Sequence, residues 1–141
     1  MLNKILVAFD GSEQAYKAFD FALEMSRLCT GANSEITAVA VAQPPEPADI
    51  VEVDAIIDSA TQHYKELFKG LRDKAREKSL EIKTEVVVGH PAEQIIKYAA
   101  ETKSDMIVVG HRGKSKIASW LQGSVSKRIA TYASCTVTIV K

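Results

Sequence analysis

The chain has 141 residues, 46% of them hydrophobic and 26% charged, and its 18 basic residues are balanced by 18 acidic ones. This length predicts a single domain over residues 1–141, with a core that needs no disulfide or metal. The balanced charge argues against nucleic acid as a partner, and no apolar run is long enough to predict a signal peptide or a membrane span. We therefore expect a soluble, cytoplasmic protein.

Cysteine and histidine are sparse. Cys29 and Cys135 are the two cysteines; they are far apart in sequence and each stands in an apolar pattern. This favours buried, reduced thiols over a disulfide, which fits a reducing compartment. His63 and His90 have no neighbours at the spacing of metal ligands or of a catalytic triad, so we expect neither a metal site nor catalytic residues of that kind.

Strand and helix patterns alternate along the chain. Residues 4–9 form a short apolar run closed by Asp-Gly-Ser, which is typical of a strand buried on both faces. After Ser12, which can cap a helix, apolar residues recur at steps of three and four up to Cys29. By the same criteria the sequence then predicts a strand at 35–42, a proline-bearing loop, a long helix at 53–75, a strand at 80–89, a helix at 91–103, a strand at 105–110, a helix at 125–133 and a strand at 135–140.

Five strands alternating with four helices predict an α/β fold built from right-handed βαβ units. The expected fold is a single-domain, Rossmann-like open parallel five-stranded sheet with helices on both faces and strand order 3-2-1-4-5. Ligands of such sheets bind beyond the carboxyl ends of the strands, where the winding reverses. Here the reversal lies between strands one and four, whose ends carry the glycine-rich and polar segments AFDGS (8–12) and VVGHRG (108–113).

The connector after the fourth strand has an unusual pattern of glycines, with Gly110, Gly113 and Gly123 followed by Ser124. It is not a Walker loop, because Val108 stands where the first glycine is required, and no GxGxxG follows the first strand. Glycines let backbone N–H groups approach phosphate oxygens, and a helix that begins at Gly123-Ser124 attracts anions. The pattern therefore indicates a phosphate-binding connector.

The spacing G-2x-G-9x-G-S resembles the ATP-binding signature of the universal stress protein (UspA-like) family, and every specified position matches. Three further segments resemble the family in the right order: the opening strand and helix, the third-strand turn VVVGHPAEQII and the closing strand CTVTIVK. The resemblance covers the whole chain. It implies an adenine nucleotide as ligand, with ATP as the cofactor, alone or with Mg²⁺.

The resemblance also implies where the nucleotide lies. Phosphates would be held by Gly113 and the turn at 123–125, Gly110 would lie near the ribose, Asp10 near the adenine and ribose, and the adenine pocket would be at Ala8 and Val41. The implied nucleotide-binding residues are Ala8, Asp10, Val41, Gly110, His111, Arg112, Gly113, Gly123, Ser124 and Val125. Other interpretations stay open: the glycines could only form turns, Ser124 could be a plain N-cap, Asp10 could only organise its turn, and Ala8 and Val41 could be ordinary core residues.

The family resemblance and the missing catalytic set favour a nucleotide-dependent regulatory or stress-response protein that is not an enzyme, with an unidentified protein partner. A slow ATPase or other nucleotide-dependent enzyme, and a dimeric interaction module without nucleotide, are the alternatives. We also expect a homodimer through the last strand, Thr136–Val140, because it is the sheet edge opposite strand three. Thr138 is the position where proline is expected to remove an edge donor.

Overall fold

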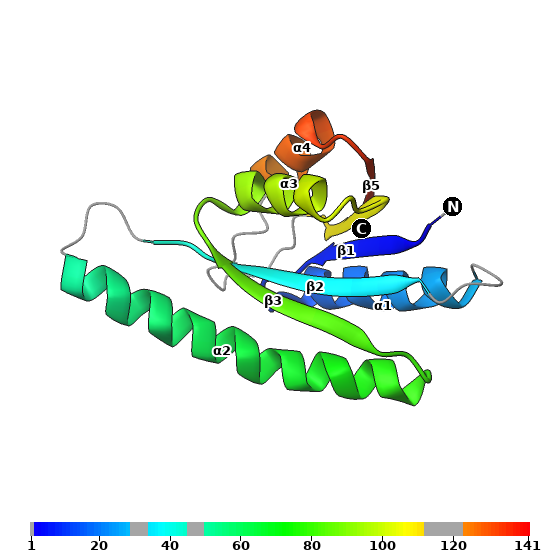
Figure 1. The fold of residues 1–141 in the computed structure, drawn as a ribbon, viewed down its shortest axis with the longest axis horizontal. Helices are drawn as coiled ribbons and strands as arrows, with labels where there is room; N and C mark the ends of the chain where they lie inside the picture. The colour runs from blue at the N-terminus through cyan, green and yellow to red at the C-terminus, as the bar shows by residue number, and fades with distance from the viewer. Residues whose placement is uncertain (1, 29–33, 45–49, 112–122) are drawn as a thin grey trace.

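The elements of the computed structural model follow one another as the sequence predicts (Figure 1). The structure describes residues 2–28, 34–44, 50–111 and 123–141. Element ends differ from the predictions by a few residues; the long helix, for example, begins at Ile50 rather than at residue 53. The elements are β1 (Lys4–Ala8), α1 (Glu13–Leu28), β2 (Glu35–Ala42), α2 (Ile50–Glu77), β3 (Ile82–Val88), α3 (Pro91–Glu101), β4 (Met106–Gly110), α4 (Gly123–Tyr132) and β5 (Thr136–Val140).

All strand pairs are parallel, and the strand order is β3-β2-β1-β4-β5. Helices α1 and α2 cover one face of the sheet, and α3 and α4 cover the other (Figure 1). The predicted fold class is therefore confirmed. Because each helix returns the chain to the start of the next strand, helices begin at the edge where strands end, here called the carboxyl edge. They end at the opposite, amino edge.

The core lies around the central strands. In β1 and β4 nearly every side chain is buried, whereas the outer strands β3 and β5 are half exposed. Phe9 packs edge-to-face on Tyr16 with ring centroids 5.1 Å apart, and Phe68 of α2 lies 6.0 Å from Phe9. A fully buried phenylalanine stabilises a fold by about 1.5–3 kcal/mol. This aromatic group therefore fixes α1 and α2 against β1.

The amino edge is held together by Asp105, which precedes β4. Its carboxylate oxygen Oδ2 accepts hydrogen bonds from the backbone N–H groups of Asn3 and Lys4, both at 2.9 Å. The backbone N–H of Asp105 in turn donates to the Lys4 carbonyl at 2.8 Å. The bonds from Lys4 and Asn3 lower the pKa of Asp105, because they stabilise its ionised form. Asp105 thus joins the start of β1 to the start of β4.

The last strand departs from the sequence predictions in two ways. Cys135 is half-buried rather than buried, because β5 lies at the edge of the sheet, and burial raises the pKa of its thiol. Cys29 lies outside the described residues. The Val140 carbonyl accepts from His111 N–H at 2.7 Å, so the backbone groups of Val140 face β4, and those of Thr138, two residues earlier, do so too. The expectation that Thr138 supplies an edge donor is therefore wrong.

Within the described ranges, no helix is long and apolar enough to cross a membrane.

Candidate functional site

The winding of the sheet reverses between β1 and β4, which lie side by side with Val7 paired to Val108. The chain leaves β1 through Asp10 and leaves β4 through Gly110 and the exposed His111. The structure therefore brings the two predicted segments together at the carboxyl edge. This is the place where open parallel sheets bind ligands.

Asp10 organises the turn into α1. Its Oδ1 accepts from the backbone N–H of Ser12 at 2.9 Å, and the Ser12 hydroxyl oxygen accepts from Ala15 N–H at 3.2 Å, as an N-cap does. Gly11 between them has φ +82°, a left-handed conformation that favours glycine. The predicted cap at Ser12 is confirmed. Asp10 is half-buried at the rim of the edge, so organising the turn still leaves it beside the site.

Ala8 and Val41 point to the same face of the sheet. Ala8 is paired with Val39, and Val41 is the next residue of β2 on that face. The face is the one covered by α3, because Lys4, two alternations before Ala8, reaches the Thr102 carbonyl at the end of α3. Both Ala8 and Val41 are fully buried and belong to the hydrophobic core, so neither side chain is open to a ligand in this structure.

Gly110 has a packing role that the sequence did not reveal. It is the last residue of β4, and a Cβ built on it would lie 2.6 Å from the backbone carbonyl oxygen of Gln14 in α1. The side-chain position of Gly110 therefore faces α1, away from the face that carries Ala8 and Val41. Close packing of β4 on the first turn of α1 requires glycine here whether or not a nucleotide binds.

Helix α4 begins at Gly123, so Ser124 lies in its first turn and is not an N-cap. Ser124 is exposed and Val125 is half-buried. The first N–H groups of a helix have no intrahelical acceptor, and the first turn of α4 carries no acidic side chain to offset them. Since α4 begins at the carboxyl edge, these donors lie at the predicted phosphate end. Arg112 and Gly113 lie outside the described residues.

The described groups at this edge are suited to binding. They are the first backbone N–H groups of α4 and the Asp10 carboxylate. Among residues 2–28, 34–44, 50–111 and 123–141, no group of three His, Cys, Asp or Glu residues could hold a metal ion. The start of α4 can hold an anion.

The fold and this edge define a Rossmann-like α/β protein with a ligand site at the winding reversal. The chain belongs to the universal stress protein family, whose sequence profile it matches over residues 1–141. It is 32% identical to universal stress protein YxiE of Bacillus subtilis over 152 aligned positions that cover 100% of both chains. The structure of UspA from Lactobacillus plantarum superposes with a TM-score of 0.86 at 23% identity, covering 99% of this chain and 98% of that one.

Solved structures of similar fold contain adenine nucleotides. A universal stress protein in complex with cAMP is 25% identical, with a TM-score of 0.66 over 99% of this chain and 97% of that one. The universal stress protein of Archaeoglobus fulgidus in complex with dAMP has a TM-score of 0.72 at 21% identity, covering 100% of both chains. A family protein of Arabidopsis thaliana with AMP bound has a TM-score of 0.68 at 21% identity, covering 99% and 91%.

Proposed function

We propose that this universal stress protein binds ATP at the carboxyl edge and acts as a nucleotide-dependent regulatory protein with little or no turnover. One observation carries the proposal: the ends of β1 and β4 and the start of α4 meet at that edge, and the intervening connector has the full glycine signature. The adenine nucleotides bound by proteins of similar fold support an adenine nucleotide as the class of ligand.

In this proposal the nucleotide lies across the winding reversal. The adenine lies near Ala8, Val41 and Asp10, which requires the atoms that cover Ala8 and Val41 to move aside, and the ribose lies near Asp10 and Gly110. The phosphates accept hydrogen bonds from Gly113 and from the first N–H groups of α4 at Gly123, Ser124 and Val125, with His111 and Arg112 beside them. A Mg²⁺ ion, if present, would be held by phosphate oxygens, because the described residues offer no cluster of ligands for it.

We expect little or no turnover because the edge lacks what hydrolysis requires. A phosphoryl-transfer site needs a group that positions or deprotonates the attacking water. Asp10 is the carboxylate that follows β1 at this edge, and its Oδ1 is already held by the backbone N–H of Ser12. A carboxylate fixed in a turn is poorly placed to activate water, so we favour a binding protein over a slow ATPase.

Calorimetry and a phosphate-release assay on the purified chain test this proposal. We expect saturable binding of ATP, together with release of an adenine nucleotide from freshly purified protein, detected by mass spectrometry. Turnover should stay well below about 1 per second, the low end for a working enzyme. No heat of binding with ATP, or turnover above that rate, would show the proposal to be wrong.

The variant Gly113→Val tests the phosphate site itself. A branched side chain at this position should block the approach of phosphate oxygens to backbone N–H groups, lowering ATP affinity by at least about tenfold, the loss expected for hydrogen bonds to a charged group. The fold should be retained, because the residue lies on a connector. The control is Gly70→Ala on α2, where an added Cβ meets no atom within 4 Å and ATP affinity should be unchanged.

We also propose that the protein works in the cytoplasm as a homodimer joined through β5. This strand is an outer strand of the sheet, and Ile139 is 37% exposed and Tyr132, at the end of α4, 67% exposed. Antiparallel pairing of two β5 strands about a two-fold axis would bury these side chains and pair the outer backbone groups. The proposed cytoplasmic location is supported by the free thiol of Cys135.

A further inference from the structure

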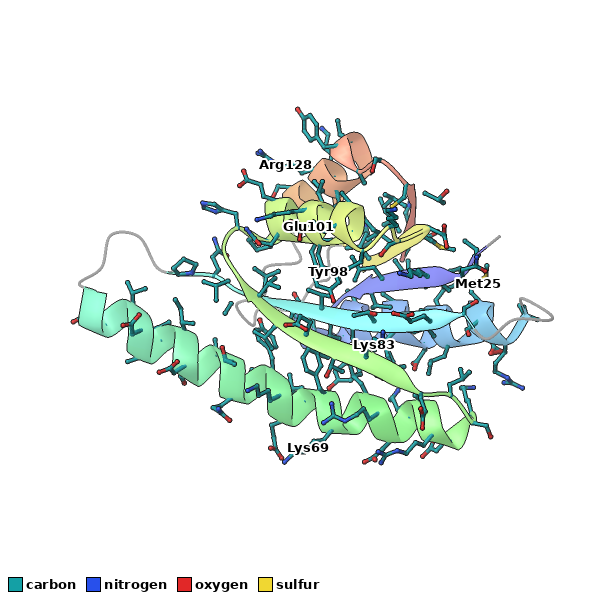
Figure 2. All side chains as sticks on the ribbon, viewed as in Figure 1. Met25, Lys69, Lys83, Tyr98, Glu101 and Arg128 are labelled. Atoms are coloured by element: carbon teal, nitrogen blue, oxygen red, sulfur yellow. The ribbon has the colours of Figure 1, made fainter. Side chains whose placement is uncertain are left out.

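A cavity of about 290 Å³ lies at the amino edge, at the opposite end of the strands from the proposed nucleotide site. Its floor is formed by the starts of β1, β2 and β3, and its roof by the end of α3 and the residues that follow it. Figure 2 shows Tyr98 between α3 and the sheet, with Lys83 on the sheet and Glu101 on the helix. The volume is at the lower end of the range for ligand sites.

Three adjacent strands each place one charged side chain on the floor of the cavity: Lys4 on β1, Glu35 on β2 and Lys83 on β3. Lys4 is paired with Glu35 in the sheet, and the Lys83 Nζ lies 2.9 Å from the Glu35 Oε1. The hydrogen bond from Lys83 lowers the pKa of Glu35, so this carboxyl stays ionised. The row holds two cations and one anion. Each ammonium has three N–H donors, and the bonds found for Lys83 and Lys4 use one each, to Glu35 and to the Thr102 carbonyl.

Two hydroxyl groups open into the same cavity. Thr37 is paired with Lys83 in the sheet register and is only 8% exposed. Tyr98 lies opposite, on α3. Neither hydroxyl makes a hydrogen bond with any residue in the described part of the chain. Both hydroxyl oxygens are reached by solvent through the cavity, so each hydroxyl is free to donate a hydrogen bond to a bound acceptor. Burial raises the pKa of Tyr98, so its hydroxyl remains a donor at neutral pH.

The end of α3 contributes little unpaired negative charge to the roof. The carbonyl of Tyr98 accepts from both the N–H and the hydroxyl of Thr102, at 3.0 and 2.7 Å, and the Ala99 carbonyl accepts from Ser104 N–H at 2.9 Å. Glu101 has Lys97 at 3.9 Å. The carbonyls of Tyr98 and Ala99 are therefore paired, and the charged residues that line the cavity are Lys4, Lys83, Lys103, Glu35 and Glu101.

We propose that this cavity, the amino-edge pocket, binds the oxyanion group of a small acidic metabolite. A carboxylate or phosphate group would accept hydrogen bonds from the Lys83 ammonium and from the hydroxyls of Thr37 and Tyr98, while Glu35 keeps its bond to Lys83. A carboxylate and a phosphate share this chemistry, and the two probes described below separate them. The pocket lies at the opposite edge of the sheet from the proposed ATP site and is distinct from it.

Nuclear magnetic resonance of the full chain, labelled with ¹⁵N, tests the proposal. Sodium succinate and sodium phosphate are titrated separately to about 20 mM, well above a Kd of about 1 mM. Ionic strength is held constant, and sodium chloride alone serves as the reference. We expect saturable shifts of the amides of Thr37, Lys83 and Tyr98 with succinate, phosphate or both, whereas the amides of Glu66 and Lys69 on α2 stay in place.

Matched variants complete the test. Thr37→Val removes one hydroxyl with little change in volume, and Lys83→Gln removes the exposed ammonium; each should raise the Kd of the bound probe by about tenfold. Lys69→Gln on α2 is the control, because Lys69 has a comparable ion pair, with its Nζ 3.0 Å from Glu66 Oε2. The Lys69→Gln variant should bind the probe with the same Kd as the wild type. The proposal is overturned if neither probe gives saturable shifts at the pocket, if chloride gives the same shifts, or if Thr37→Val and Lys83→Gln bind as tightly as Lys69→Gln.

Discussion

Gly110, at the end of β4, is a position where both packing and ligand binding favour glycine. In sequence, Gly110 is the first member of a phosphate-binding signature; in the structure, its missing side chain makes room for the Gln14 carbonyl of α1. A substitution at Gly110 would disturb the fold together with any nucleotide site. Gly113 is for this reason the cleaner position for a binding test.

Gly110→Ala should destabilise the protein by about 1–3 kcal/mol, as overpacking in a tight interior does. The reason is the 2.6 Å approach of a new Cβ to a backbone oxygen, which cannot move without shifting α1. Gly70→Ala is the matched control: it adds the same methyl group to an open site on α2 and should stabilise by up to about 1 kcal/mol. Urea unfolding of the two variants measures both changes, and equal midpoints would contradict the packing argument.

Asp105 gives the stability of the protein a predictable dependence on pH. Its pKa is lowered in the folded state, so its contribution is complete above the pKa of the unfolded chain, near the ordinary value of 3.8, and is lost as the pH falls through the folded value. Asp105→Asn should therefore unfold at lower urea than the wild type at pH 7, and the gap should narrow below about pH 4.

The control for this variant is Asp73→Asn, which alters an exposed pair on α2 whose carboxylate lies 3.5 Å from Arg76. Exposed pairs contribute little, so its urea midpoint should stay near that of the wild type at pH 7. A gap between wild type and Asp105→Asn that is the same at pH 7 and pH 3 would mean that ionisation of Asp105 is not the source of its effect.

At the scale of the elements, the backbone groups on the outer side of β5 determine whether a second chain can pair with this strand. Backbone groups alternate in direction along a strand, so with Val140 and Thr138 facing β4, those of Val137 and Ile139 face outward. A proline at Thr138 would break a bond inside the sheet. A proline at Ile139 removes a donor from the outer side, where a second copy would bind.

Ile139→Pro should convert the proposed dimer into a monomer of 15.4 kDa while the sheet is retained. Light scattering at micromolar concentration measures the mass, and circular dichroism checks the fold. Tyr132→Ala serves as a second variant, because it truncates an exposed side chain of α4 without touching the strand and should weaken the dimer less. A wild-type mass near 15.4 kDa would refute the dimer, and an unchanged dimer of folded Ile139→Pro would refute its location.

The elements themselves were predictable, because buried strands and amphipathic helices leave different periods in the sequence. Their ends were less so. The apolar run 4–9 continues through Phe9, whereas β1 ends at Ala8, the last residue paired with β2. Nothing in the run marks where that pairing stops. Ser124 could be interpreted as an N-cap for a similar reason, because glycine can stand either just before a helix or inside its first turn. In the structure, Gly123 is the first residue of α4.

At the scale of the whole molecule, the two candidate sites differ in how visible they are in the sequence. The carboxyl edge was predictable, because parallel topology alone brings the ends of β1 and β4 together and the connector carries a spaced motif. The amino-edge pocket was not, because Lys4, Thr37, Lys83 and Tyr98 come from four separate elements. Alternating charged residues on β3 read only as an exposed edge strand. Only the register that sets Thr37 beside Lys83 reveals the site.

The central position of β1 has a consequence for how the protein is made. One neighbour of β1 is β2, the next strand along the chain. The other neighbour is β4, and Asp105, which joins the start of β4 to the start of β1, is 102 residues beyond Asn3. At a synthesis rate of about 5–20 residues per second, the ribosome needs about 5–20 s to deliver it. Until then, the edge of β1 that pairs with β4 has no partner, even after β2 and β3 have been made. We therefore expect the yield of folded protein to depend on how well that edge is shielded during translation, and not on the stability of the finished sheet alone.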